Sequence, residues 1–374
     1  FGKRPWTMIQ HDEASVARAE YEVLRMTKMA ESTVEAYTRL APDAELPAGL
    51  AGLKDAMTDG WAKAMEAIEP FFELFDRGTG HRYPLLQDIV DHSNFNPDYL
   101  AANHGITAEH IEALYACAKY RFECGEYSVA AEMLAYYREL VPVESERSLR
   151  ALWGKLLADI LSGDRWEAAN DDREALHGLI NKAEFSELEA LQQRTWLLHA
   201  SLVVFANIDN GKDQLVEWFF ADKNLNALQL NSPWLLRYLT ACILTSRKRH
   251  IFTKQLLRAI AQEATTYRDP IIEFVEALLL SFDFDGAQAK LAEVASVITT
   301  DYFLSSLTTP EEFMGAARRF IFETYCRIHQ KIGLECVARL GAAFTHTHPS
   351  AHSYDYPPTP PNPRRAVCCR PSCT

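Results

Sequence analysis

Glycine and proline are scarce in this sequence, whose 374 residues include 16 glycines and 17 prolines. This scarcity excludes collagen-like chains, and 11% aromatic residues supply enough apolar side chains to exclude general disorder. Long apolar runs are lacking as well. The longest covers residues 196–208 and contains His199, whereas a membrane-spanning helix needs about 20 apolar residues. We therefore expect no membrane span.

Positive charge is in deficit, because 38 Lys and Arg residues face 51 Asp and Glu residues and leave a net charge of −13. Such a chain repels nucleic-acid backbones and anionic membranes in general, although a local basic patch can override the repulsion. No apolar secretory segment follows Phe1. Since the first residue is not Met, we expect the natural N-terminus to lie further upstream.

The eight cysteines lack the dense, regular spacing of a secreted disulfide framework. Five of them lie singly among apolar helical segments and are expected to be buried free thiols: Cys117, Cys124, Cys242, Cys326 and Cys336. The sequence therefore favours a cytoplasmic protein, with a nuclear pool allowed.

Helical periodicity is the dominant pattern. Apolar residues recur at offsets of 0, 3, 4, 7 and 11 in three segments, which begin at Ile111, Leu149 and Ile271 and end at Phe122, Ile160 and Phe282. No sustained period-two alternation occurs before residue 330, so strands are not expected there. Ser232-Pro233, Asp269-Pro270 and Thr309-Pro310 predict helix starts, and Glu312 predicts a capping box after Thr309.

A turn pattern repeats between paired helices, in which an aromatic residue precedes an alanine by three positions. The pairs are Tyr127 and Ala130, Trp166 and Ala169, and Phe284 and Ala287. The spacings indicate a repeat of about 40 residues, typical of stacked helical hairpins. Five buried side chains contribute on the order of 10 kcal/mol, whereas ordering a twelve-residue helix costs roughly 12–24 kcal/mol. Each hairpin must therefore pack on the next, which predicts an all-α solenoid.

Composition changes at both ends divide the chain into three expected parts. Residues 1–80 hold weaker helical segments, residues 81–330 the helical repeats, and residues 331–374 a tail rich in Pro, Cys and His. The tail is expected to be extended or disordered.

Several ungapped runs between residues 85 and 330 resemble the E subunit of eukaryotic translation initiation factor 3, which belongs to the PCI-domain family. The runs are residues 115–142, 191–199, 269–276, 281–288 and 320–330. The resemblance implies a right-handed PCI-type solenoid followed by a winged helix, but the winged helix is expected to be missing or degenerate after Gln330. It also implies a non-catalytic scaffold in a hetero-oligomer, with the other factor subunits and the small ribosomal subunit as partners.

One basic cluster interrupts the acidic sequence and comprises Arg247, Lys248, Arg249, Lys254 and Arg258. A solvated helix face is the plainer interpretation, because runs of charge are usually that. A contact with ribosomal RNA or with an acidic partner segment is the functional alternative, and phosphate contacts would make that binding depend on salt.

Chemical motifs are missing where an enzyme would carry them. The sequence has no Gly-rich phosphate loop, no His-Glu-x-x-His helix and no Gly-x-Ser-x-Gly turn. The cysteines and histidines of the tail fit no common zinc module: Cys368, Cys369, Cys373, His346, His348 and His352. We therefore expect no catalytic site, metal or cofactor. Trp153, Trp166, Tyr127 and Phe284 are expected in the solenoid core, and His199 as a hydrogen-bonded core histidine.

Two other interpretations stay open from the sequence. A PCI subunit of the proteasome lid or of the COP9 signalosome would share the architecture, and a helical-repeat protein could bind RNA through the basic cluster. Affinity purification followed by mass spectrometry would separate these from an initiation-factor subunit by the proteins that accompany the chain.

Overall fold

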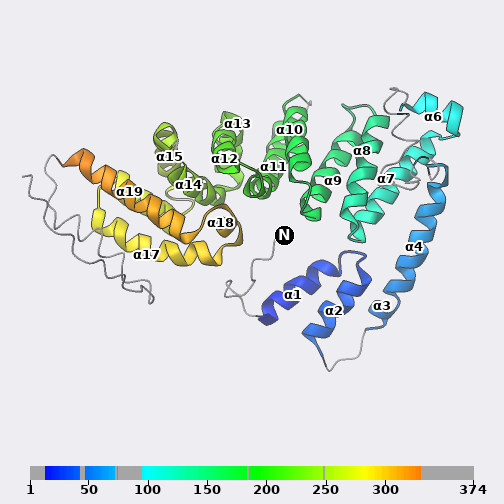
Figure 1. Cartoon of the computed structure of the whole chain (residues 1–374), viewed down its shortest axis with the longest axis horizontal. Coiled ribbons are helices and arrows are strands. Elements are labelled where there is room, and N and C mark those ends of the chain that lie inside the picture. The colour runs from blue at the N-terminus through cyan, green and yellow to red at the C-terminus, as the bar shows by residue number, and fades with distance from the viewer. Residues whose placement is uncertain are drawn as a thin grey trace, which may run out of the picture. The chain divides into compact units, whose positions relative to one another are not determined.

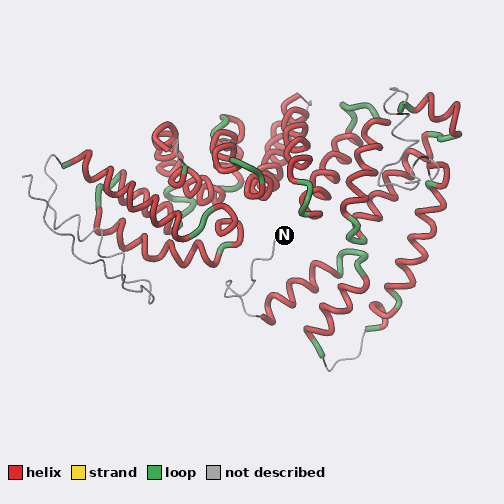
Figure 2. The backbone as a smooth tube through the Cα atoms, viewed as in Figure 1, coloured by secondary structure: helices red, strands yellow, loops and turns green. Residues whose placement is uncertain are grey.

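The computed structural model describes residues 13–42, 47–71, 74, 89, 95–182, 185–246 and 249–329. In these ranges the regular structure is helical and no strand occurs, as Figure 2 shows. The chain divides into two compact units, residues 1–321 and residues 322–374. The segment after Gln330, where the winged helix is expected to be missing or degenerate and the Pro-, Cys- and His-rich tail is expected, lies outside the described residues.

The first unit begins with short helices and continues as a row of packed helices (Figure 1). The helices up to the tenth are α1 (Glu13–Leu24), α2 (Ala30–Leu40), α3 (Ala48–Ala51), α4 (Leu53–Ala67), the 3-10 turn η2 (Glu69–Phe71), α6 (Pro97–His104), α7 (Ala108–Glu123), α8 (Tyr127–Leu140), α9 (Glu146–Ser162) and α10 (Trp166–Lys182). From α7 to α11 each helix packs against the next along the chain. The predicted all-α solenoid of stacked hairpins is confirmed.

Further helices follow in the second half of the row. They are α11 (Glu187–Asn207), α12 (Gly211–Phe219), α13 (Asp222–Asn231), η3 (Pro233–Leu235), α14 (Leu236–Thr245), α15 (Arg249–Glu263), α16 (Pro270–Leu279), α17 (Phe284–Thr300), α18 (Tyr302–Leu307) and α19 (Pro310–Ile328). The boundary between the two units falls inside α19.

The repeated turn has the predicted geometry. Tyr127, Trp166 and Phe284 are the first residues of α8, α10 and α17, and the alanine three positions on in each helix is fully buried. A methyl side chain at that position allows two helix backbones to approach closely. The aromatic residues themselves are half-buried rather than core residues, so that part of the expectation is corrected.

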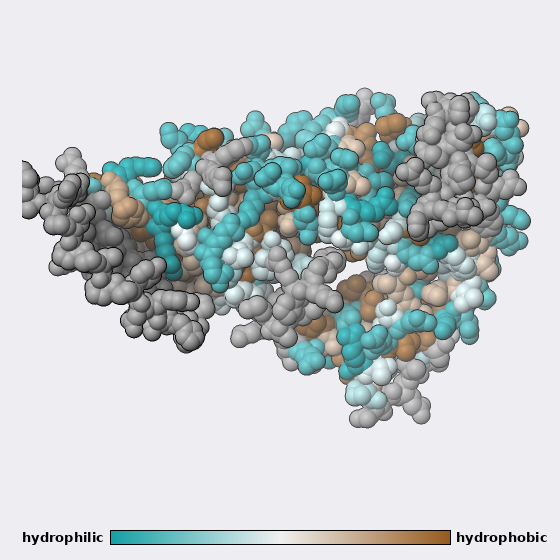
Figure 3. Space-filling model, in the orientation of Figure 1, coloured by the Kyte–Doolittle hydropathy of each residue, from teal (hydrophilic) through white to brown (hydrophobic). Residues whose placement is uncertain are grey.

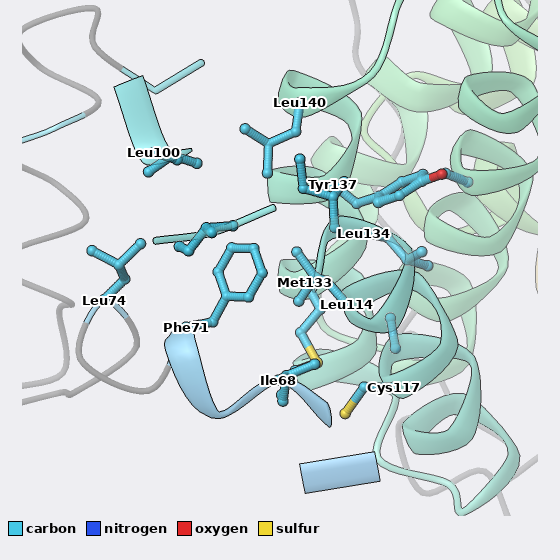
Figure 4. Packing of buried hydrophobic residues seen from close by; sticks show 14 of the residues in the cluster. Ile68, Phe71, Leu74, Leu100, Leu114, Cys117, Met133, Leu134, Tyr137 and Leu140 are labelled. Atoms are coloured by element: carbon cyan, nitrogen blue, oxygen red, sulfur yellow. The ribbon is translucent and has the colours of Figure 1, made fainter. Parts of the chain in front are cut away.

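Apolar packing joins the N-terminal helices to the row. Phe71 at the end of η2 is fully buried beside Leu114 of α7 and Met133 of α8 (Figure 4). A second buried cluster, centred on Leu152 and Leu156 of α9, joins α9 to α10 and α11. Burying one such side chain contributes about 1.5–3 kcal/mol, so packing between neighbours holds the stack together.

The predicted helix starts are borne out in part. The Asp269 carboxylate accepts from the Ile271 N–H at 3.1 Å, and the Thr309 hydroxyl accepts from the Glu312 N–H at 3.2 Å. The Glu312 carboxylate instead accepts from the Thr308 hydroxyl and from Lys212. Ser232 makes no capping bond, because Pro233 begins a 3-10 turn rather than an α-helix.

Two further expectations need correction. Helix α16 ends at Leu279, so Phe282 does not continue its apolar face; it has a φ of 53° and a 55% exposed side chain. Among the cysteines, Cys117 and Cys242 are buried free thiols, whereas Cys124 and Cys326 are half-buried. Cys336 lies outside the described residues.

Arg237 of α14 links three helices of the second half. Its guanidinium donates to Asp269 at 2.9 Å and to Asp301 at 2.8 Å. Each of these carboxylates also caps a helix, Asp269 that of α16 and Asp301 that of α18. One cation therefore holds the starts of two helices against α14, and the Asp269 and Asp301 carboxylates raise the pKa of Arg237 against the opposing effect of burial.

Candidate interaction surface

Only part of the basic cluster lies in the described part of the chain. Arg247 and Lys248 lie outside the described residues, and Arg249 begins α15 without a described side chain. Lys254 and Arg258 are exposed on α15, four positions apart and hence on one face. A contact of this cluster with RNA or an acidic partner stays a prediction.

A hollow of about 730 Å³ opens between α9 and α11, and aromatic side chains dominate its walls. We call it the aromatic pocket and define it by Tyr115 of α7, Trp153 of α9, Phe185 just before α11, and Trp196 of α11. Further apolar lining comes from the outward side of α9. Its size suits one or two large side chains of a partner.

Two tryptophans are set edge to face in this pocket. The ring centroids of Trp153 and Trp196 are 6.4 Å apart at an interplanar angle of 83°, an arrangement that aromatic quadrupoles favour. The Trp153 Nε1–H donates to the Gln193 Oε1 at 2.7 Å, which fixes the indole. Trp153 is therefore a half-buried wall of the pocket rather than a core residue, and Trp196 is 50% exposed.

His199 forms the adjoining wall and is hydrogen-bonded, as expected, but it is only half-buried. Its Nδ1 lies 2.7 Å from the Thr195 carbonyl, which assigns the proton to Nδ1. Its Nε2 accepts from the Trp234 Nε1–H at 3.1 Å. Both ring nitrogens are thus engaged, and His199 is not positioned as a general base for a substrate in the pocket.

The polar rim of the pocket is satisfied internally. Glu146 pairs with Arg150 one helical turn later on α9. The Glu189 carboxylate accepts from the backbone N–H and the hydroxyl of Ser186 at 3.1 and 2.8 Å, and these hydrogen bonds lower the pKa of Glu189. With Glu146 in an ion pair and Glu189 hydrogen-bonded to Ser186, the pocket offers a partner mainly aromatic and other apolar surface.

The rest of the described chain offers neither a metal site nor a membrane segment. The described residues contain no group of three His, Cys, Asp or Glu side chains arranged to hold a metal, and the tail residues considered for metal binding lie outside them. Among the helices that the structure describes, none combines the length and apolarity that crossing a bilayer requires. The face in Figure 3 is mostly hydrophilic, with separate hydrophobic residues exposed between hydrophilic ones.

The pocket was missed in the sequence, although α11 carried a signal. The buried face of that helix includes Leu197, Leu198 and Ser201, and Trp196 falls outside it. A tryptophan on the solvent face of an amphipathic helix indicates a contact surface. The run of apolar residues around it concealed this position.

Comparisons with known proteins identify the family to which this chain belongs. Residues 7–121 match the family model described as the eIF3 subunit 6 N terminal domain. The E subunit of eukaryotic translation initiation factor 3 from Bombyx mori is 36% identical over 338 residues, covering 88% of this chain and 74% of that protein. The chain belongs to the E-subunit family of initiation factor 3. This confirms the resemblance given by the residues.

Other members of the E-subunit family agree. The Arabidopsis thaliana protein is 34% identical over 338 residues, covering 88% of this chain and 75% of its own length. The Brugia malayi protein is 35% identical over 337 residues, covering 89% of this chain and 73% of its own length. The family model reaches residue 7, so similarity to the family begins further toward the N-terminus than the runs identified in the sequence.

Proposed function

We propose that this chain is a non-catalytic scaffold subunit of initiation factor 3, which acts in the cytoplasm through protein–protein contacts. Its partners would be the other factor subunits and the small ribosomal subunit, in assembly of the small-subunit initiation complex. Membership of the E-subunit family and the stacked-hairpin fold support this proposal. The single observation that carries it is the aromatic pocket, whose two carboxylates, Glu146 and Glu189, already have partners within the chain.

An exposed tryptophan in a pocket is the typical energetic centre of a protein interface. A few aromatic residues dominate binding in most interfaces, and tryptophan is the most enriched among them. Trp196 has half of its surface free, and Trp153 is held in place behind it by Gln193. A large apolar side chain inserted here would bury both rings without having to break an ion pair.

We place the assembly contacts mainly on the helical repeats of residues 81–330, between an N-terminal segment, residues 1–80, and the tail, residues 331–374. Lys254 and Arg258 on the exposed face of α15 support a further contact with ribosomal RNA or an acidic partner. A chain ending at Gln330 tests the first point, since it should still co-purify with its partners.

The decisive experiment is co-purification of the tagged full chain from cells, with Trp196→Ala against the unaltered chain. We expect recovery of at least one initiation-factor subunit to fall at least about tenfold. Leu230→Ala is the control, because Leu230 is 71% exposed on α13 and away from the pocket lining. Circular dichroism should be unchanged for both variants. Unaltered recovery of all the factor's subunits with Trp196→Ala would contradict the proposal.

A further inference from the structure

A cluster of three cationic side chains and one histidine lies where α10, α11 and α13 meet, and it is short of anions. We call it the cationic cluster and define it by Arg173, His177, Arg194 and Lys223, joined by Asn181. We infer that the cationic cluster is a binding site for one oxyanion, a carboxylate or phosphoryl group carried by a side chain of a protein partner.

Arg194 is the buried member without a counter-ion. It is 7% exposed, and its Nη2 donates to the Asn181 Oδ1 at 2.7 Å. Its Nη1 is buried and has no hydrogen-bond partner. Among the described residues no carboxylate forms an ion pair with it, and burial lowers its pKa. A guanidinium buried in this way is costly unless an anion reaches it.

Asn181 occupies the place that an anion would take. Its neutral amide oxygen accepts from Arg194 and also lies 3.5 Å from the Lys223 ammonium. Its amide nitrogen lies 3.2 Å from His177 Nε2. Because Asn181 is exposed at the last turn of α10, its side chain can turn outward and leave these donors to an incoming oxyanion.

Arg173 adds positive charge behind this position. It is 3% exposed and lies against the rings of Phe205 and Trp218, 4.7 and 5.2 Å from their centroids. The carboxylate that pairs with it belongs to an exposed residue, the next one along α10. Burial and then the charges of Arg194, Arg173 and Lys223 lower the pKa of His177. The field is therefore positive where the Trp218 Nε1–H is also buried without an acceptor.

The arrangement favours a single side chain over a nucleic-acid backbone. RNA presents repeated phosphates and needs a row of exposed cations, whereas two of these cations are buried and Lys223 is exposed at the edge. The chain's net charge of −13 also repels a polyanion. The assignment to a protein partner rests on the proposed scaffold function; binding of the oxyanion itself does not.

The first test is calorimetry and thermal unfolding of the full chain with inorganic phosphate, against chloride at equal ionic strength. We expect phosphate to bind and to raise the unfolding temperature. Lys223→Gln should weaken phosphate binding about tenfold, because one charge-assisted bond is lost. Lys182→Gln removes an exposed cation from the same helix end and should leave binding unchanged. An equal response to phosphate and chloride, or equal affinities in both variants, would overturn the inference.

Asn181→Asp sharpens the test without removing a buried group. It places a carboxylate between Arg194 and Lys223, so we expect a higher unfolding temperature and no phosphate response. Glu184, which lies outside the described residues, is the carboxylate nearest to Asn181 in the sequence and tests whether the chain supplies its own anion. Glu184→Gln should change neither the unfolding temperature nor phosphate affinity. A phosphate response that is created or enlarged by Glu184→Gln would show that the chain supplies its own anion and would refute the site.

The source of the anion is tested last, with a phosphoserine peptide and a single-stranded RNA of equal charge as probes. Tighter binding of the peptide, lost in Asn181→Asp, supports the protein partner; tighter binding of RNA overturns that assignment. Trp196→Ala should keep the phosphate response. The scaffold proposal is therefore tested by Trp196→Ala, and the cationic cluster by Lys223→Gln and Asn181→Asp, so that failure of one can be told from failure of the other.

Discussion

The interface around α7 and α8 and the interface between α9 and α10 solve the same packing problem with different chemistry. The first buries Phe71, Leu114 and Met133 without a charge among its core residues. The second combines Leu152 and Leu156 with a buried ion network. In the interface around α7 and α8, each apolar side chain contributes to stability on its own. In the interface between α9 and α10, each buried charge is stabilising only while its oppositely charged partner is present.

The ion network has one cation at its centre. Lys155 of α9 donates to Asp159 at 2.9 Å on its own helix and to Asp172 at 2.7 Å on α10. Arg165 pairs with the second oxygen of Asp159 at 3.1 Å. Asp159 is fully buried. Because the Lys155–Asp172 ion pair joins α9 to α10, it also determines which residues of the two helices face each other.

Removal of Lys155 should give the largest effect of any single substitution considered. Lys155→Ala leaves two buried carboxylates beside each other, and we expect a loss of about 3–5 kcal/mol in the free energy of unfolding. Urea unfolding followed by far-ultraviolet circular dichroism measures it. Lys119→Ala, at an exposed position of α7, is the control and should cost well under 1 kcal/mol. Equal losses would mean that the network contributes nothing.

Substitutions in the apolar interface around α7 and α8 should lower the free energy of unfolding by an amount that does not depend on pH. Leu114→Ala removes a fully buried side chain and should cost about 3 kcal/mol, from lost burial plus the cavity left behind. Val143→Ala, 60% exposed, should be nearly neutral in the same urea titration. The loss for Leu114→Ala should be the same at pH 5 and pH 7, since no ionisable group is removed. If the loss of unfolding free energy caused by Leu114→Ala changed with pH, the interface around α7 and α8 would also depend on charged groups, and the two interfaces would not differ as described.

The sequence predicted the first interface better than the second. The face of α7 was identified from Ile111, Leu114 and Ala118, which are buried. The face of α9 was identified from its apolar members alone, whereas Lys155 and Asp159 lie on the same buried stripe. Their spacing of four places them on one face of α9, but Asp172, which completes the network, lies on α10. A contact across helices is not contained in the periodicity of either one.

The interaction surfaces were harder still to predict. The basic cluster stood out because its members adjoin in sequence. Trp153, Trp196 and Trp234 lie on separate helical elements, and Asn181 meets Arg194 across α10 and α11. Sequence periodicity identifies which apolar residues face inward. The aromatic pocket instead arises from half-exposed aromatic residues, and the cationic cluster from buried and exposed polar ones, that the stacking of hairpins brings together.

A change of pH is expected to have a smaller effect on the stability of the folded chain. Burial, the largest cause, raises the pKa of Asp172 from 3.8 to about 6. A folded-state pKa above the unfolded value means that this carboxyl contributes most below pH 3.8 and that its contribution is lost as pH rises toward 6. Lowering the pH from 7 to 5 should therefore raise the stability of the unaltered chain relative to Asp172→Asn. Glu174→Gln, on the exposed side of α10, should not alter this dependence; parallel pH profiles for the unaltered chain and Asp172→Asn would refute the raised pKa.

The smallest effect on stability belongs to the outward face of α15, which contributes to neither interface. The double change Lys254→Glu and Arg258→Glu should shift the free energy of unfolding by no more than about 0.5 kcal/mol, because both side chains are exposed. If this face contacts RNA or an acidic partner, the same change should reduce co-sedimentation with small ribosomal subunits, and the reduction should diminish as salt is raised. The same charge change at exposed positions elsewhere, Lys54→Glu with Lys119→Glu, controls for charge alone. Unchanged co-sedimentation at every salt concentration would leave Lys254 and Arg258 as solvated surface charges.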